Sequence, residues 1–148
     1  MIRLGQKKRI ETREALLEKL QEVLRAEPMV KFAYVFGSVV AGSRGPLSDI
    51  DVAVYCDARA DYLSFRAALM ERLVRGLGME NVDLVVLNNA PAELRYSVIL
   101  GGRIVKEDKA RRVPFETATL SEYLDFSPFR DVQSSAIRRH VESGEYFG

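Results

Sequence analysis

Residues 31–56, KFAYVFGSVVAGSRGPLSDIDVAVYC, are the stretch that decides the fold. Two apolar, β-prone runs, residues 31–36 and 49–56, flank a turn that opens with Gly37 and Ser38. Read alone, the glycine and serine are a common strand-to-helix turn with a serine N-cap. Glycine has no Cβ, however, so a phosphate chain can approach this backbone closely. The spacing before the next acids favours this phosphate-binding interpretation, with Ser38 donating to a terminal phosphate.

Two acids follow the turn and open the second strand. Side chains alternate along a strand, so Asp49 and Asp51 share one face while the apolar residues between and after them face a core. They could be simple strand-start charges. Asp51, however, sits where an apolar residue would continue the alternation. Adjacent carboxylates repel each other and favour a divalent cation, and Mg²⁺ prefers such oxygen ligands together with substrate phosphates. The pattern therefore predicts a site for a metal-bound nucleoside triphosphate.

A third acid, Asp83, lies in the β-branched run at residues 81–88, NVDLVVLN. On its own it is most simply a strand-edge charge. If this strand pairs beside residues 49–56, its carboxylate reaches the same edge as Asp49 and Asp51. Three acids there would hold two metals about 3.5–4 Å apart, in the arrangement used for in-line displacement. Asp83 would then also help to deprotonate the attacking hydroxyl.

The rest of the chain alternates between helical and strand patterns. Apolar periodicity and Gly/Pro punctuation predict one domain of the mixed α/β (α+β) class, a small sheet of about four strands with helices backing one face. The predicted helices are residues 10–26, 61–78 and 91–102, with a short helix or turn at 38–44; the predicted strands are 31–36, 49–56, 81–88 and 103–107.

The C-terminal part has a different pattern. We divide the chain into a core, residues 1–110, and a helical extension, residues 111–148. One apolar stripe runs from Phe115 to Leu124 and a second lies within residues 129–141. Such stripes more often pack on their own domain, but an amphipathic helix can also occupy a groove of a partner protein.

Composition narrows the possible chemistry. The chain has 148 residues, 47% hydrophobic and 29% charged, with a net charge of +1, so nothing favours direct nucleic-acid binding. Cys56 is the lone cysteine, which excludes an intrachain disulfide and is consistent with the cytoplasm. No run of residues predicts a membrane span. With a single histidine, His140, zinc sites and Cys–His catalysis are nearly excluded. Carboxylates remain as the reactive groups.

The spacing of these residues resembles that of the nucleotidyltransferase superfamily of DNA polymerase β: Gly-Ser, ten residues, Asp-x-Asp, and a later Asp on another strand. More narrowly, the chain resembles the minimal nucleotidyltransferases (MNT), which are the antitoxin halves of HEPN/MNT toxin–antitoxin pairs. The resemblance continues through AELRYSVILGGRIVKED (92–108) and FETATLSEYLDFSPFRD (115–131), and covers roughly residues 10–135. It implies the polymerase β-like fold with a C-terminal helical tail.

The resemblance also implies roles for particular residues. Asp49, Asp51 and Asp83 would be catalytic and would hold Mg²⁺, two ions in all; the ATP-binding residues would be Gly37, Ser38, Gly42, Arg44 and Ser48. Many relatives carry Arg-Gly after the Gly-Ser turn, whereas this chain has VVAG, and Arg44 is the candidate replacement. Arg95 is a second candidate for a phosphate or base contact. For either arginine, an ordinary surface role is the simpler reading. Tyr96 is expected to serve packing.

By resemblance, the reaction is transfer of AMP from ATP to a tyrosine hydroxyl of a cognate HEPN ribonuclease toxin, in a hetero-oligomeric complex, which silences the toxin. A macromolecular acceptor suits a small domain with little chain left to enclose a small molecule. Two alternatives remain: a steric binding antitoxin with a vestigial nucleotide site, and a nucleotidyltransferase that modifies a small-molecule hydroxyl.

Overall fold

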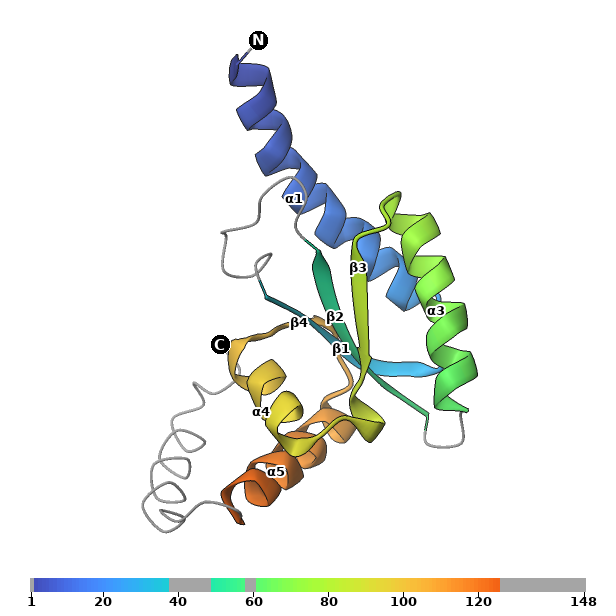
Figure 1. The fold of residues 1–148 in the computed structure, drawn as a ribbon, viewed down its shortest axis with the longest axis vertical. Coiled ribbons are helices and arrows are strands. Elements are labelled where there is room, and N and C mark those ends of the chain that lie inside the picture. The colour runs from blue at the N-terminus through green and yellow to red at the C-terminus, as the bar shows by residue number, and fades with distance from the viewer. Residues whose placement is uncertain (1, 38–48, 58–60, 126–148) are drawn as a thin grey trace.

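The computed structural model describes residues 2–37, 49–57 and 61–125, with side chains from residue 14 onward (Figure 1). Four strands form one sheet, and helices precede, separate and follow the strands along the chain. In chain order the elements are α1 (Ile2–Arg25), β1 (Val30–Phe36), β2 (Ile50–Cys56), α3 (Tyr62–Leu77), β3 (Val82–Val86), the 3₁₀ turn η1 (Leu87–Asn89), α4 (Ala92–Gly101), β4 (Arg103–Lys106) and α5 (Lys109–Asp125).

The sheet has the strand order β3-β2-β1-β4, so β3 and β4 are its edges. β1 is antiparallel to both β2 and β4, whereas β2 and β3 are parallel. The carboxyl end of β1 therefore lies at the same end of the sheet as the amino ends of β2 and β3. The mixed sheet of four strands confirms the predicted fold class.

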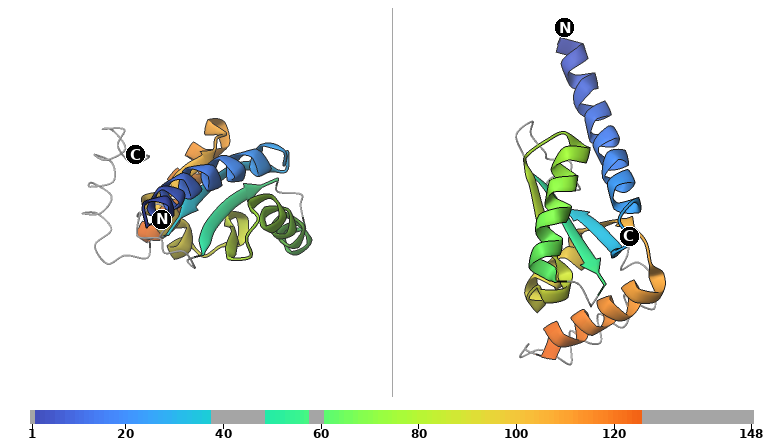
Figure 2. Two further views of the ribbon diagram at one scale, coloured as in Figure 1. Left: turned by 90° about the horizontal axis from the view of Figure 1, so that it is seen from above. Right: turned by 90° about the vertical axis from the view of Figure 1, so that its right-hand side faces the viewer.

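Helices cover both faces of the sheet, and the prediction that they back only one face was wrong (Figure 2). α1 and α3 pack on the face that carries Ala33 and Val35, and α4 and α5 pack on the face that carries Phe32 and Tyr34. β1 is apolar at nearly every position rather than at alternate ones. A continuous apolar run is typical of a strand that is buried on both sides.

The start of the first helix differs from the sequence-based expectation. α1 begins at Ile2 rather than residue 10, and its amino-terminal part projects beyond the sheet (Figure 1). Residues 2–9 carry no apolar stripe, so periodicity did not reveal this part of the helix. The expected turn or short helix at 38–44 and the second apolar stripe at 129–141 lie outside the described residues. In the described part of the chain, no helix combines the length and apolar character needed to cross a membrane.

Candidate active site

The predicted acids lie together where β2 and β3 begin. Asp51 and Asp83 are direct partners in the parallel register of the two strands, and Asp49 lies just before β2. A backbone hydrogen bond of 2.8 Å, from the N–H of Ile50 to the carbonyl of Asn81, fixes this register. Ile50 belongs to the core under α1 and α3, so the alternation of the strand places Asp51 and Asp83 on the opposite face. Asp51 and Asp83 thus lie side by side on adjacent strands, as expected from the sequence.

Gly37 lies against the carboxylate of Asp51. Its φ of +78° is in the left-handed region, which glycine adopts at little cost. A Cβ at this position would lie 2.2 Å from Oδ2 of Asp51. Only glycine fits here, because any side chain would both strain the backbone and displace the carboxylate. The glycine identified in the sequence therefore has a specific spatial role beside the acids.

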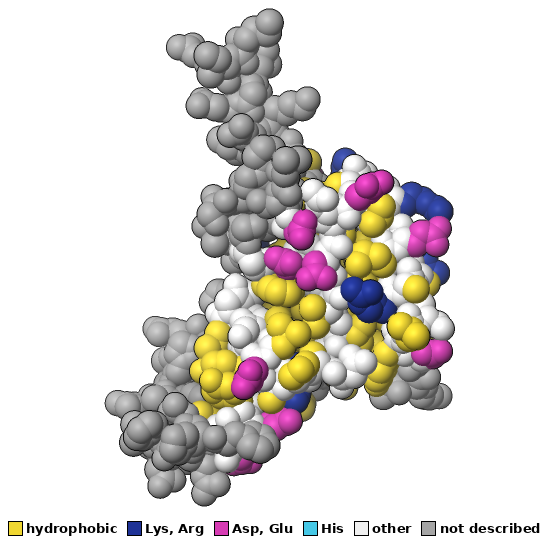
Figure 3. All heavy atoms as spheres, in the orientation of Figure 1, with side chains coloured by type: hydrophobic (Ala, Val, Ile, Leu, Met, Phe, Trp, Pro, Cys, Tyr) yellow, Lys and Arg dark blue, Asp and Glu magenta, His cyan; other side chains and the backbone are white. Residues whose placement is uncertain are grey.

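The three acids influence one another electrostatically. The pKa of Asp51 is raised, first by its partial burial and then by the negative charges of Asp83 and Asp49. Asp49 and Asp83 are exposed, while Asp51 is half-buried. Figure 3 shows acidic side chains gathered on this surface, over the beginnings of β2 and β3. A bound cation would remove the repulsion that these carboxylates exert on one another.

The donor set suits a hard divalent cation, because it consists of carboxylate oxygens. Within the described residues, however, no three His, Cys, Asp or Glu side chains stand close enough together to hold a metal ion. Strand register brings the acids into one neighbourhood. Repulsion between their charges opposes closer contact, so ligation requires further approach of their side chains. The residue types fit Mg²⁺, and Asp49, Asp51 and Asp83 are the residues that would hold it.

The other predicted binding residues have different outcomes. Ser38, Gly42, Arg44 and Ser48 lie outside the described residues. Arg95 joins α4 to α5 rather than facing the acids: it donates to the Ala90 carbonyl, to Oγ1 of Thr119 and, at 2.6 Å, to the Glu122 carboxylate. It therefore has a structural role.

Tyr96 stacks on Tyr123 of α5, with ring centroids 4.0 Å apart and planes 7° from parallel. The expectation that Tyr96 serves packing is confirmed.

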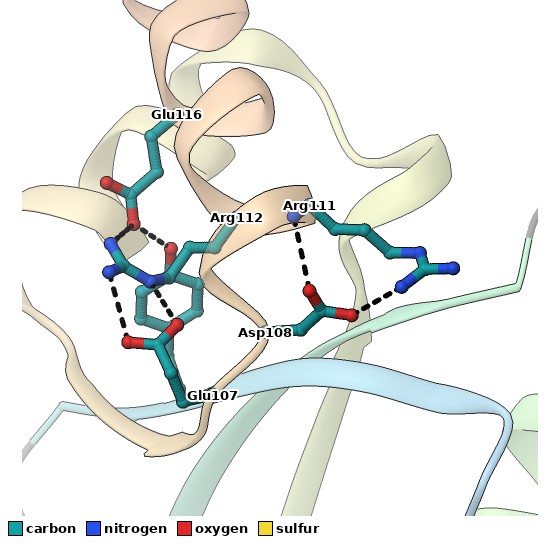
Figure 4. Close-up of polar contacts among 6 residues, drawn as sticks. Glu107, Asp108, Arg111, Arg112 and Glu116 are labelled. Carbon is teal, nitrogen blue, oxygen red and sulfur yellow. Dashed lines mark hydrogen bonds and ion pairs between the residues drawn. The ribbon is translucent and has the colours of Figure 1, made fainter.

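Sequence reasoning missed a buried polar cluster that attaches α5 to β1 (Figure 4). Glu116 of α5 is fully buried and accepts a short hydrogen bond from the hydroxyl of Tyr34. Arg112 donates to the same oxygen of Glu116 at 3.0 Å and to both oxygens of Glu107 at 2.7 and 3.0 Å. The spacing of Arg112 and Glu116 is i,i+4, which is equally common in exposed helical pairs, so nothing in the sequence marked the pair as buried.

The cluster shifts the ionisation of its members. Burial raises the pKa of Glu116 to about 7, against the opposing effects of the Tyr34 and Arg112 hydrogen bonds. Burial also raises the pKa of Tyr34, and the hydrogen bond to Glu116 adds to this increase. For Arg112, burial lowers the pKa, but the hydrogen bonds to Glu107 and Glu116 outweigh burial and raise it overall.

Comparison with known proteins adds independent information. The family model described as "Polymerase beta, Nucleotidyltransferase" matches residues 18–111. No curated protein matches the chain. A chain of the crystal structure of a toxin–antitoxin with AMP-PNP is 28% identical, with a TM-score of 0.66, over 82% of this protein and 98% of that chain.

Two further solved structures are similar. A chain of the toxin–antitoxin MntA-HepT is 25% identical, with a TM-score of 0.61, over 84% of this protein and 98% of that chain. A chain of the complex of tri-AMPylated Shewanella oneidensis HEPN toxin with MNT antitoxin is also 25% identical, with a TM-score of 0.61, over 85% and 98%. The family model covers well over half of the chain and contains the acidic end of the sheet. This protein is therefore a member of the polymerase β nucleotidyltransferase family.

Proposed function

We propose that this protein is a cytoplasmic antitoxin that transfers AMP from ATP to a tyrosine hydroxyl of a cognate HEPN-family toxin, with Mg²⁺ as cofactor. The observation that carries the proposal is the pairing of Asp51 with Asp83 beside Gly37 at one end of the sheet. Similar structures include a toxin–antitoxin with AMP-PNP and an AMPylated HEPN toxin in complex with its MNT antitoxin.

In the proposed reaction, the hydroxyl oxygen of the acceptor attacks the α-phosphorus of ATP. The bond from the α-phosphorus to the bridging oxygen of the β-phosphate breaks, and pyrophosphate leaves. Asp83 is the proposed acceptor of the hydroxyl proton. Gly37 leaves room for the triphosphate close to the backbone, and Ser38, Gly42, Arg44 and Ser48 are the proposed phosphate contacts. Mg²⁺ held by Asp49, Asp51 and Asp83 would neutralise the charge that develops on the phosphates.

The proposal can be tested with the double variant Asp49→Ala/Asp51→Ala and the control Glu80→Gln, which changes an exposed acid at the same end of the sheet. Each is incubated with labelled ATP, Mg²⁺ and the co-purified partner, and AMP transfer is measured by mass shift. We expect the double variant to lose both AMP transfer and neutralisation of the toxin while it still forms the complex. The control should match the wild type. Full neutralisation by the double variant would instead establish a steric antitoxin.

A further inference from the structure

The strand that carries Asp83 is the least supported strand near the candidate active site. β3 has five residues and lies at an edge of the sheet, where β2 is its one partner among the strands that the structure describes. Asp83 is its second residue. Edge strands lack one of the two neighbours that hold a central strand, and they open more readily. The location of Asp83 therefore depends on whatever else restrains β3.

Arg66 supplies such a restraint. Its Nε donates a hydrogen bond of 2.9 Å to the carbonyl of Leu84, the residue directly after Asp83. Arg66 belongs to α3, which is anchored in the core by its fully buried Leu69 and Leu73. The bond thus ties the edge strand to a well-packed helix in addition to β2. A hydrogen bond from a charged donor is stronger than one between neutral groups.

The restraint opposes a specific force. Asp49, Asp51 and Asp83 carry like charges in one neighbourhood, and β2 lies between two other strands while β3 does not. Repulsion among the acids would therefore displace β3 rather than β2. We propose that Arg66 is a positioning residue that holds Asp83 beside Asp51 for metal binding. This inference rests on the Mg²⁺-dependent transfer proposed above.

The side chains of glutamine and methionine separate this role from general packing. Nε2 of glutamine is as many bonds from the backbone as Nε of arginine, so Arg66→Gln retains a donor at the same place. Arg66→Met has a similar length and no donor. Arg75→Met is the matched control, because Arg75 is an exposed residue of the same helix that pairs with Glu71, four residues earlier. The comparison isolates the hydrogen bond to Leu84.

Two measurements do not require catalysis. The first is hydrogen exchange of the β3 amides in the metal-free protein, and the second is titration with Mn²⁺ in the presence of AMP-PNP. We expect the β3 amides of Arg66→Met to exchange faster than those of the wild type, with a smaller change elsewhere. Arg66→Met should also bind Mn²⁺ about tenfold more weakly than the wild type, as is typical when a residue that orients a metal ligand is lost. The kcat for AMP transfer should fall more than the KM for ATP changes. Arg66→Gln should recover most of both properties, and Arg75→Met should match the wild type.

A double-mutant comparison tests whether Arg66 acts through Asp83. In an Asp83→Asn background, Arg66→Met should have no further effect on Mn²⁺ affinity. Equal Mn²⁺ affinity and equal β3 exchange in Arg66→Met and Arg75→Met would overturn the proposal. If Arg66→Met does not fold, Arg66→Lys, which moves the donor one atom outward, serves instead: weaker Mn²⁺ binding supports the role, and wild-type binding refutes it. Suppose that Asp49→Ala/Asp51→Ala loses AMP transfer while Arg66→Met binds Mn²⁺ normally. That result would reject the positioning role of Arg66 and leave the proposed function intact.

Discussion

Replacing Glu116 with glutamine is expected to change how the stability of the protein depends on pH. Glu116 is 0% exposed, and among the described residues its Oε2 has no hydrogen-bond partner. Burial raises its pKa from the ordinary value of 4.5 to about 7, although the hydrogen bonds from Tyr34 and Arg112 act in the opposite direction. The folded protein therefore binds this proton more tightly than the unfolded chain does.

The sign and size of the effect follow from these two pKa values. Stabilisation by the bound proton is fully present below about pH 4.5 and is lost as the pH rises through about 7. At 1.36 kcal/mol per pH unit, the complete effect is about 3 kcal/mol. Glutamine cannot ionise, but its side-chain oxygen can still accept the hydrogen bonds from Tyr34 and Arg112. Between about pH 5 and pH 8, Glu116→Gln should thus become more stable relative to the wild type by up to about 3 kcal/mol.

Urea unfolding of both proteins across this pH range gives the required free energies of unfolding. Glu122→Gln is the control, because Glu122 lies on the same helix but is 48% exposed and pairs with Arg95. Its replacement should change stability by less than about 1 kcal/mol at every pH, as is usual for an exposed ion pair. A constant difference between the wild type and Glu116→Gln over the whole range would show that Glu116 does not titrate as proposed.

Three further predictions concern the active site and the interface between α4 and α5. Gly37→Ala should lower AMP transfer by at least about tenfold, because its Cβ would meet Asp51. Gly78→Ala is the control: Gly78 also has a positive φ, +68°, but nothing lies within 4 Å of the new Cβ, so AMP transfer should stay at the wild-type rate. The pKa of Asp51 is raised, and the metal binds the ionised carboxylate. As the pH is lowered, Mn²⁺ affinity should therefore begin to weaken at a higher pH than at a site whose aspartates have the ordinary pKa; calorimetric titration at several pH values measures this. Tyr96→Ala should lower the free energy of urea unfolding by about 1–3 kcal/mol and Tyr96→Phe by much less, because phenylalanine keeps the stack on Tyr123.

The end of the sheet with the acids could be predicted from sequence because its signals are local. Gly37 and the Asp49–Asp51 pair are close together in the sequence, and the alternation of a strand is enough to place both acids on one face. The pairing of Asp51 with Asp83 required only that two neighbouring strands begin at the same end, and the fold meets that condition. Close approach of Gly37 to the Asp51 carboxylate then explains why glycine is present.

The cluster around Glu116 could not be predicted in the same way. A glutamate on a helix normally faces solvent, and burial of the charge of Glu116 requires a partner that is remote in sequence. Tyr34 is 82 positions away, within the apolar run at residues 31–36. Proline disfavours the interior of a helix, yet α5 runs from Lys109 to Asp125 with Pro114 inside it. Tertiary contacts decided both features.

These contacts also make α5 part of the unit that supports the acids. The family match ends at residue 111, directly before Arg112, but the face of β1 that carries Tyr34 is closed by α4 and α5. Phe115 packs against the ring of Phe32, with centroids 5.4 Å apart, and Glu116 bonds to Tyr34. β1 continues two residues beyond Tyr34 to Phe36, which is the register partner of Asp51. Displacement of α5 would therefore uncover the face of the strand that leads directly into Gly37, next to the Asp51 carboxylate.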